Sequence, residues 1–168
     1  MPKKILFVLH EDSQTGAPNA LLSFLKYINA HYKNEFVIDI YVLNYFGGIE
    51  KELKQICRNY YINKKKKTVF GKIAKLFCAN INSILKQKKY DLVYGNTIVT
   101  LNLLSSLKQH NNKVKTLLYV HESKFLTNIY LDKQKASNQF KNINHVFAVS
   151  QAAVNNLVEN YNVPQDKC

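Results

Sequence analysis

The sequence predicts an α/β fold in three layers, with one parallel sheet of about six or seven strands and helices on both faces. First, short apolar runs alternate six times with segments whose apolar residues recur at helical spacing. Second, the first apolar run, KILFVLH, leads through a small-residue loop directly into a helical pattern. Third, 168 residues are enough to bury one core, so we expect residues 1–168 to form a single domain.

The individual elements follow from this alternation. Strands are expected at the apolar or alternating runs 4–9, 36–43, 58–62, 91–94, 115–120 and 146–149. Helices are expected where the apolar spacing is helical, over 17–30, 49–56, 69–85, 98–107, 130–141 and 150–160, the last one capped by Ser150. This order is typical of a Rossmann-like sheet with right-handed crossovers.

Ligands of such sheets bind at the carboxyl ends of the strands, where the strand order reverses. With the common order, the first and fourth strands are neighbours at that point. Three segments are then expected to face one crevice: residues 10–18, 95–97 and 121–122.

The loop SQTGAP between the first strand and the first helix has the chemistry of an anion site. Gly16 permits a close backbone approach, and Pro18 suits the first turn of a helix. The helix N-terminus then offers free N–H groups to a phosphate, although an ordinary strand-to-helix turn has the same composition. Neither GxGxxG nor GxxxxGK[ST] occurs, which disfavours NAD and P-loop chemistry.

The chain is strongly basic, with a formal net charge of +13 that comes almost entirely from lysine. Such an excess favours a polyanionic partner or an anionic membrane surface. The only cluster is Lys64, Lys65, Lys66 and Lys67, which we interpret either as a contact for anionic groups or as a solvated loop.

The three cysteines form no CxxC pair and no zinc spacing. We therefore expect a reducing, cytoplasmic compartment and no metal site. No apolar run approaches the ~20 residues of a membrane helix, and no secretory signal is expected at the N-terminus.

His121 follows an apolar strand and stands beside Glu122 at the predicted crevice. A histidine in that position can be functional or merely structural. His10 and Glu11 repeat the same dipeptide at the end of the first strand.

Four segments in this order, KILFVLHEDSQTGAPNALLSFL, DLVYGNTIVTLNLL, LLYVHES and VFAVSQAAVNNLVENYNVP, resemble the N-terminal half of a GT-B glycosyltransferase of the family-4 type. The resemblance spans essentially the whole chain and implies one half of a GT-B fold. It also implies a second Rossmann-like domain, outside this chain, that holds most of the nucleotide-sugar site.

The resemblance implies roles for particular residues. The donor-phosphate loop corresponds to Thr15, Gly16 and Ala17, with Thr15 where the family often has a second glycine. The acceptor cleft corresponds to Gly95, Asn96 and Thr97, to which we add His10. The catalytic candidates are His121 and Glu122.

The implied function is transfer of a hexose, with retention of configuration, from a nucleotide-sugar substrate to a glycan or lipid-linked acceptor in cell-surface polysaccharide synthesis. No permanent cofactor and no metal are expected. The enzyme is expected in the cytoplasm, peripheral to the inner face of the plasma membrane, and this domain alone is expected to be inactive.

Two alternatives remain at this stage. A basic α/β module that binds nucleic acid without catalysis would explain the charge, but arginine-rich and RNP-type motifs are lacking. A receiver or flavodoxin-like domain would use the acidic pair Glu11-Asp12, but the third strand ends without the acid that a receiver needs. We therefore expect no nucleic-acid partner.

Overall fold

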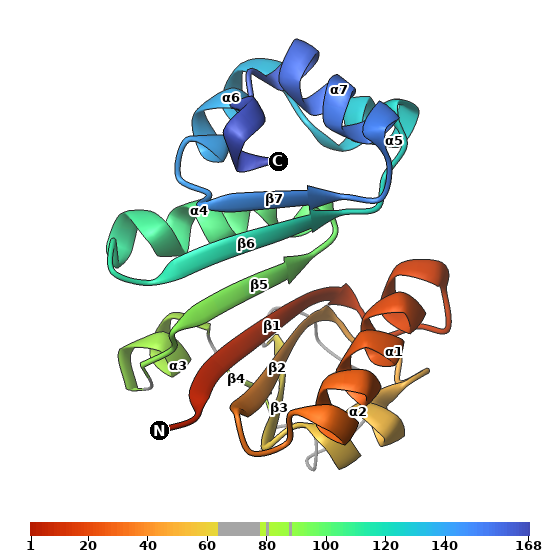
Figure 1. Cartoon of the computed structure of the whole chain (residues 1–168), viewed down its shortest axis with the longest axis vertical. Helices are drawn as coiled ribbons and strands as arrows, with labels where there is room; N and C mark the ends of the chain where they lie inside the picture. Colours follow the sequence, from red (N-terminus) through yellow and green to blue (C-terminus); the bar gives the residue numbers. More distant parts are fainter. Residues whose placement is uncertain (64–77, 80, 88) are drawn as a thin grey trace. The chain divides into compact units, whose positions relative to one another are not determined.

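The computed structural model describes residues 1–63, 78–79, 81–87 and 89–168. The predicted fold class is confirmed: strands and helices alternate along the chain (Figure 1), and the strand pairs within each unit are parallel. The chain divides into two compact units, Met1–Asp91 and Leu92–Cys168. The lysine cluster 64–67 and most of the predicted helix 69–85 lie outside the described residues.

The first unit contains a parallel sheet in the order β4-β3-β2-β1. Its strands are β1 (Lys3–Glu11), β2 (Phe36–Asn44), β3 (Asn59–Asn63) and β4 (Cys78–Ala79). Its helices are α1 (Gly16–His31), α2 (Glu50–Ile56) and α3 (Ile81–Gln87). The predicted strands 4–9, 36–43 and 58–62 thus agree with β1, β2 and β3 to within a few residues.

Apolar periodicity decides which surfaces of the first unit are buried. The core of β1 is an unbroken apolar run from Ile5 to Leu9, all of it buried, as expected for a parallel strand covered on both faces. Helix α1 has buried side chains on one stripe only, namely Pro18, Leu21, Leu22, Leu25 and Ile28.

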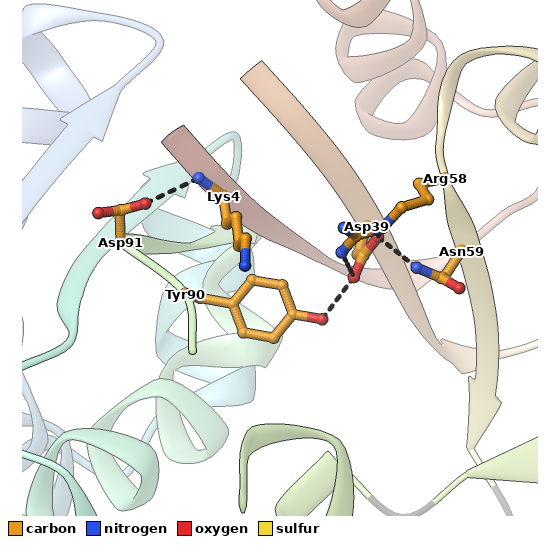
Figure 2. Close-up of polar contacts among 6 residues, drawn as sticks. All are labelled: Lys4, Asp39, Arg58, Asn59, Tyr90 and Asp91. Atoms are coloured by element: carbon orange, nitrogen blue, oxygen red, sulfur yellow. Dashed lines mark hydrogen bonds and ion pairs between the residues drawn. The ribbon is translucent and has the colours of Figure 1, made fainter. Parts of the chain in front are cut away.

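A buried carboxylate, Asp39, ties the strands of the first unit together at the opposite end from the strand-end loops (Figure 2). It accepts hydrogen bonds from Arg58 Nη2 at 2.9 Å, Asn59 Nδ2 at 2.8 Å and the Tyr90 hydroxyl at 2.6 Å. Burial alone would raise the pKa of Asp39, but these hydrogen bonds outweigh it and hold the pKa below its ordinary value. Each of these three hydrogen bonds has an ionised acceptor and is therefore charge-assisted.

The last residues of the first unit are fastened to β1. The Lys4 N–H donates to Asp91 Oδ2 at 2.8 Å, and the Asp91 N–H donates to the Lys4 carbonyl at 2.9 Å (Figure 2). Tyr90 is held to β2 at the same time through Asp39. The segment that leaves the first unit is thus fixed by two independent sets of bonds.

The second unit contains a parallel sheet in the order β5-β6-β7. The strands are β5 (Leu92–Asn96), β6 (Lys115–Val120) and β7 (His145–Ala148). The helices are η2 (Ile98–Thr100), α4 (Leu101–His110), α5 (Lys124–Tyr130), α6 (Lys133–Phe140), α7 (Gln151–Tyr161) and η3 (Gln165–Lys167). The predicted cap of α7 is confirmed, since Ser150 Oγ accepts from the Ala153 N–H at 3.3 Å.

The helix predicted over 130–141 is present as α6 but begins three residues later, at Lys133, and the helix α5 at 124–130 was not predicted. The reason is local: Asp132 is extended, and its side chain accepts from the Lys135 N–H at 2.8 Å as the N-cap of α6. None of the helices that the structure describes is long and apolar enough to cross a membrane.

Candidate functional site

The carboxyl ends of β5 and β6 bring four predicted site residues together. Because Asn96 pairs with Tyr119 in the β5–β6 register, the residues that follow the two strands emerge at the same edge. His121 Nε2 lies 3.1 Å from Asn96 Oδ1. We call Asn96, Thr97, His121 and Glu122 the β5–β6 cluster.

His121 has the environment of a neutral imidazole. Its ring is half-buried, and its centroid lies 4.2 Å from that of Tyr119. Burial lowers its pKa below the ordinary value, so the ring is uncharged at neutral pH. With Asn96 Oδ1 as acceptor, the hydrogen bond assigns the proton to Nε2 and leaves the lone pair of Nδ1 available.

Glu122 is buried, and its carboxylate contacts backbone nitrogens. Its carboxylate oxygens lie 3.2 and 3.1 Å from the Ile98 nitrogen, and Oε2 also accepts from the His121 N–H at 3.0 Å. Burial raises the pKa of Glu122, and the backbone donors partly oppose that rise. These contacts make Glu122 a positioning residue for the turn after β5 and for His121, while a direct catalytic part stays a prediction.

The turn after β5 is strained at Thr97. Its φ of 94° lies in the left-handed region that side chains other than glycine rarely adopt. The turn is held by the Thr97 N–H, which donates to the Tyr119 carbonyl at 2.9 Å, and by Thr100 Oγ1, which donates to the Thr97 carbonyl at 2.8 Å. Within the described residues, the buried Thr97 hydroxyl has no hydrogen-bond partner. Strain and an unsatisfied polar atom at one residue are features that concentrate at functional sites.

Gly95 is needed for packing. A Cβ at this position would collide with Thr100 Oγ1 and would lie 2.9 Å from the Leu104 side chain. The absence of a side chain therefore lets η2 and α4 lie directly on β5. Its predicted place in an acceptor cleft stays a prediction.

The predicted donor-phosphate loop lies in the first unit and is open to solvent. Thr15 is the N-cap residue of α1, and a Cβ on Gly16 would meet nothing within 4 Å. One feature of this loop was missed from sequence: Glu11 Oε1 accepts from Ser13 Oγ at 2.6 Å and from Thr15 Oγ1 at 3.2 Å. A carboxylate thus already lies beside the exposed N-terminus of α1, close to Ala17.

Asp12 is a second residue that sequence reasoning left without a role. It is completely buried and accepts from the Phe46 N–H at 2.5 Å, the Gly47 N–H at 3.0 Å and the Tyr60 hydroxyl at 2.6 Å. A Cβ on Gly48 would lie 2.9 Å from the Gln14 nitrogen, so the two strand-end loops are in close contact. The sequence signal was an acid placed directly after a buried strand.

The structure therefore joins some predicted site residues and leaves others apart. Asn96, Thr97, His121 and Glu122 meet in the second unit, whereas His10 and residues 15–17 belong to the first unit. A shared crevice between the two groups stays a prediction. Among the described residues, no group of three or more His, Cys, Asp or Glu could hold a metal ion.

A pocket of about 300 Å³ opens beside the β5–β6 cluster within the second unit. Its lining residues come from η2, the start of α4, the end of α5, the linker that follows and α6. Its lining combines apolar side chains with amide, carboxylate, ammonium and phenol groups, and comprises Ile98, Val99, Asn102, Tyr130, Leu131, Asp132, Lys135, Ala136 and Gln139.

Comparison with known proteins connects this geometry to solved structures. A scan of protein-family models finds no match, and a search of curated proteins finds none either. The structure of HepE from Anabaena, in complex with UDP and glucose, matches with a TM-score of 0.67 at 18% identity, covering 98% of this chain and 43% of that chain. The apo form of WaaB, a lipopolysaccharide outer core galactosyltransferase, matches with a TM-score of 0.64 at 11% identity, covering 98% of this chain and 44% of that chain.

The chain has the fold of one half of a GT-B glycosyltransferase. The GT-B resemblance of the sequence is thereby confirmed for the fold. The chain spans less than half the length of either solved protein, and at 18% and 11% identity the likeness establishes the fold alone. Roles of individual residues in this GT-B half rest on the geometry described above.

Proposed function

We propose that this chain is the acceptor-side, N-terminal part of a glycosyltransferase that moves a hexose from a nucleotide-sugar donor to a glycan or lipid-linked acceptor. The observation that carries the proposal is the β5–β6 cluster, a neutral His121 held by Asn96 at the strand ends of a GT-B half. Support comes from the matched structures, since HepE was solved with UDP and glucose and WaaB is a galactosyltransferase.

His121 is the residue that contacts the reacting groups in this proposal. Nδ1 of the neutral ring accepts a hydrogen bond from a sugar hydroxyl of the donor or the acceptor. Asn96 fixes the ring orientation, and Glu122 fixes the backbone on which the ring stands. The pocket beside Ile98 supplies amide and carboxylate groups near a tyrosine ring, a combination that suits the hydroxyls and the flat face of an acceptor sugar.

The donor diphosphate is proposed to bind at the N-terminus of α1. The exposed N-cap residue Thr15 and the open space at Gly16 allow a phosphate to approach the N-terminus of α1 and its positive dipole end. Glu11 carries the same charge as the phosphate, so its side chain has to turn away from Thr15 when the donor binds.

The remaining parts of the proposal concern the whole protein. A second domain outside these residues binds and recognises the nucleotide and the donor sugar. Transfer retains the anomeric configuration and uses no metal ion. The enzyme acts at the cytoplasmic face of an anionic membrane in the synthesis of a surface polysaccharide. The net charge of +13 supports that location.

The test is substitution of His121 by alanine in the full-length protein. We expect His121→Ala to lower kcat/KM for UDP-sugar donors at least ~100-fold, equivalent to about 2.7 kcal/mol of transition-state stabilisation. The melting temperature should change little, because the ring is only half-buried. Activity of the wild type should fall only when the pH drops below the lowered pKa of His121, where Nδ1 becomes protonated.

His10→Ala is the matched control, because His10 precedes an acid at the end of another strand. A folded His121→Ala protein with wild-type kinetics would remove His121 from the site. A variant that loses several degrees of melting temperature together with activity would make His121 a structural residue.

A further inference from the structure

Asp12 is a buried acid of the first unit to which the proposed reaction gives no part, although it lies three residues before the N-cap of α1. In the β1–β2 register Glu11 pairs with Asn44, so the loops after these two strands leave the sheet at the same edge. The first loop, residues 12–15, leads into α1, and the second, residues 45–49, leads into α2. Any contact between the two loops therefore restricts where the N-terminus of α1 can lie.

The carboxylate of Asp12 makes such a contact. Its Oδ1 accepts from two consecutive N–H groups of the second loop, those of Phe46 at 2.5 Å and Gly47 at 3.0 Å. The φ of 76° at Gly47, which glycine adopts without strain, lets the loop turn at this point. Oδ2 accepts from the Tyr60 hydroxyl of β3 at 2.6 Å. One side chain at the end of β1 thus holds both the second loop and the neighbouring β3.

Further bonds reinforce this contact. The Ile49 N–H donates to the Asp12 carbonyl at 3.0 Å, and Gln14 Nε2 donates to the Gly48 carbonyl at 3.2 Å. A Cβ on Gly48 would lie 2.9 Å from the Gln14 nitrogen, so the two loops leave no room for a side chain between them. We call the bonds of Asp12 and Gln14 to residues 46–49 the Asp12 clamp.

A comparison with Asp39 separates the Asp12 clamp from an ordinary stabilising network. Both acids are completely buried in the first unit, but Asp39 forms an ion pair with Arg58 at 2.9 Å. Across the described part of the chain, no lysine, arginine or histidine forms an ion pair with Asp12. Burial of a carboxylate without a cation is costly, and an apolar side chain would avoid that cost. What the acid adds at this position is a fixed geometry of the two loops.

We propose that Asp12 is a positioning residue of the donor-phosphate loop, which holds the N-terminus of α1 in place by fastening the loop after β1 to the loop after β2. The inference rests on the proposed function, in which the donor diphosphate binds at residues 15–17. A binding site that is already ordered before its ligand arrives loses less conformational entropy on binding. Because Asp12 is completely buried, it acts through the loop and not on the substrate.

The first measurement requires no sugar transfer. Amide hydrogen exchange is followed by NMR in the 168-residue chain, at the N–H groups of Phe46 and Gly47 and at that of Asn19, whose backbone bond closes the first turn of α1. We expect Asp12→Ala to raise the exchange rates of all three groups at least ~10-fold. Asp39→Ala is the matched control, because it removes an equally buried acid, and it should leave the Asn19 rate within about twofold of the wild-type rate.

The second measurement is donor kinetics of the full-length protein. We expect Asp12→Ala to raise the KM for UDP-glucose or UDP-galactose at least ~10-fold. Asp12→Asn should bring KM back to within about threefold of the wild-type value, because its amide oxygen accepts from Phe46 and Gly47 and its amino group donates to Tyr60. Asp39→Ala should lose stability but keep the KM of the wild type.

Gly48→Ala tests the Asp12 clamp from the second loop, and it replaces Asp12→Ala if that variant does not fold. Its Cβ pushes the loops apart, so Asn19 exchange and donor KM should both rise although the acid is present. Unchanged Asn19 exchange in these variants, or an equal rise in Asp39→Ala, would overturn the proposal.

A wild-type donor KM in an active Asp12→Ala enzyme would also overturn the proposal, whatever the exchange rates. A full-length wild type that forms no product from sugar nucleotides would instead refute the proposed function. The Asn19 exchange rates would then still decide whether Asp12 positions the N-terminus of α1.

Discussion

At the scale of single residues, the β5–β6 cluster contains a buried acid, Glu122, whose carboxylate bonds to the backbone. The Glu122 carboxylate accepts hydrogen bonds from the N–H groups of Ile98 and His121. The Glu122 carboxylate therefore links the turn that contains Thr97 to the backbone of His121. In the proposed reaction, this rigidity keeps the His121 ring oriented before the substrate arrives.

The role of Glu122 leads to a prediction about stability. Glu122→Ala leaves two N–H groups without an acceptor, and each buried unsatisfied donor costs about 1–3 kcal/mol. We therefore expect the free energy of unfolding to fall by at least ~2 kcal/mol in urea titrations. The pKa of His121, followed by NMR, should rise toward its ordinary value as the loosened turn admits water.

Two further variants make this test specific. Glu122→Gln keeps one oxygen acceptor and should lose about half as much stability. Glu159→Ala removes an exposed acid from α7 and should change the free energy of unfolding by less than about 0.5 kcal/mol. Equal stabilities of Glu122→Ala and the wild type would show that the backbone bonds to Glu122 contribute nothing.

At the scale of elements, buried carboxylates connect strands and loops that local sequence keeps apart. Asp39 joins β2 to β3 and to the segment that contains Tyr90, and Asp12 joins the loop after β1 to the loop after β2. Both acids are completely buried and both receive several hydrogen bonds. The first unit is therefore held at both ends of its sheet by polar bonds as well as by its apolar core.

The Asp39 network leads to a prediction with a pH signature. Asp39→Ala leaves the buried Tyr90 hydroxyl and the Asn59 amide without their acceptor, and should cost about 3 kcal/mol of unfolding free energy at neutral pH. Because the folded-state pKa of Asp39 is lowered, its stabilisation is present above the unfolded pKa of about 3.9 and is lost as pH falls through the folded value. The variant should therefore lose less stability than the wild type on acidification.

The measurement is urea unfolding of both proteins at neutral pH and at several acid pH values. Asp91→Ala is the control, since Asp91 is also a hydrogen-bonded acid of the first unit but lies on the surface, and it should cost less than about 1 kcal/mol. If the unfolding free energies of the wild type and Asp39→Ala changed with pH in parallel, the lowered pKa of Asp39 in the folded protein would be contradicted.

At the scale of the whole molecule, the chain has one half of the fold seen in HepE and WaaB. We expect the 168-residue chain alone to form no product from UDP-glucose or UDP-galactose. The physical reason is that stabilising a leaving diphosphate requires preorganised donors around it, and in the proposed function this chain supplies only part of them.

Product formation is measured with the chain alone and, as a control, with the full-length protein. Turnover by the chain alone at an ordinary enzymatic rate of ~1–10³ s⁻¹ would show that these residues hold a complete site. An inactive chain beside an active full-length protein would agree with a site shared between two domains.

The sequence by itself determined the class of fold and several positions of interest. Apolar or alternating runs predict β1, β2, β5 and β6, because the buried positions of a strand require apolar side chains that the local sequence displays. It also placed Asn96 and His121 at strand ends, and parallel register then brings them within 3.1 Å.

Only the tertiary structure decided which groups the buried acids bond to and which apolar side chains stay exposed. Asp12 and Phe46 are 34 residues apart, and Glu122 and Ile98 are 24 apart, so no local pattern marks these bonds. The exposure of Phe125 and Ile129 on α5 is likewise invisible in the sequence, since KFLTNIY is rich in large apolar residues. Whether such a helix is buried depends on which elements the fold packs against it, and those contacts come from distant parts of the chain.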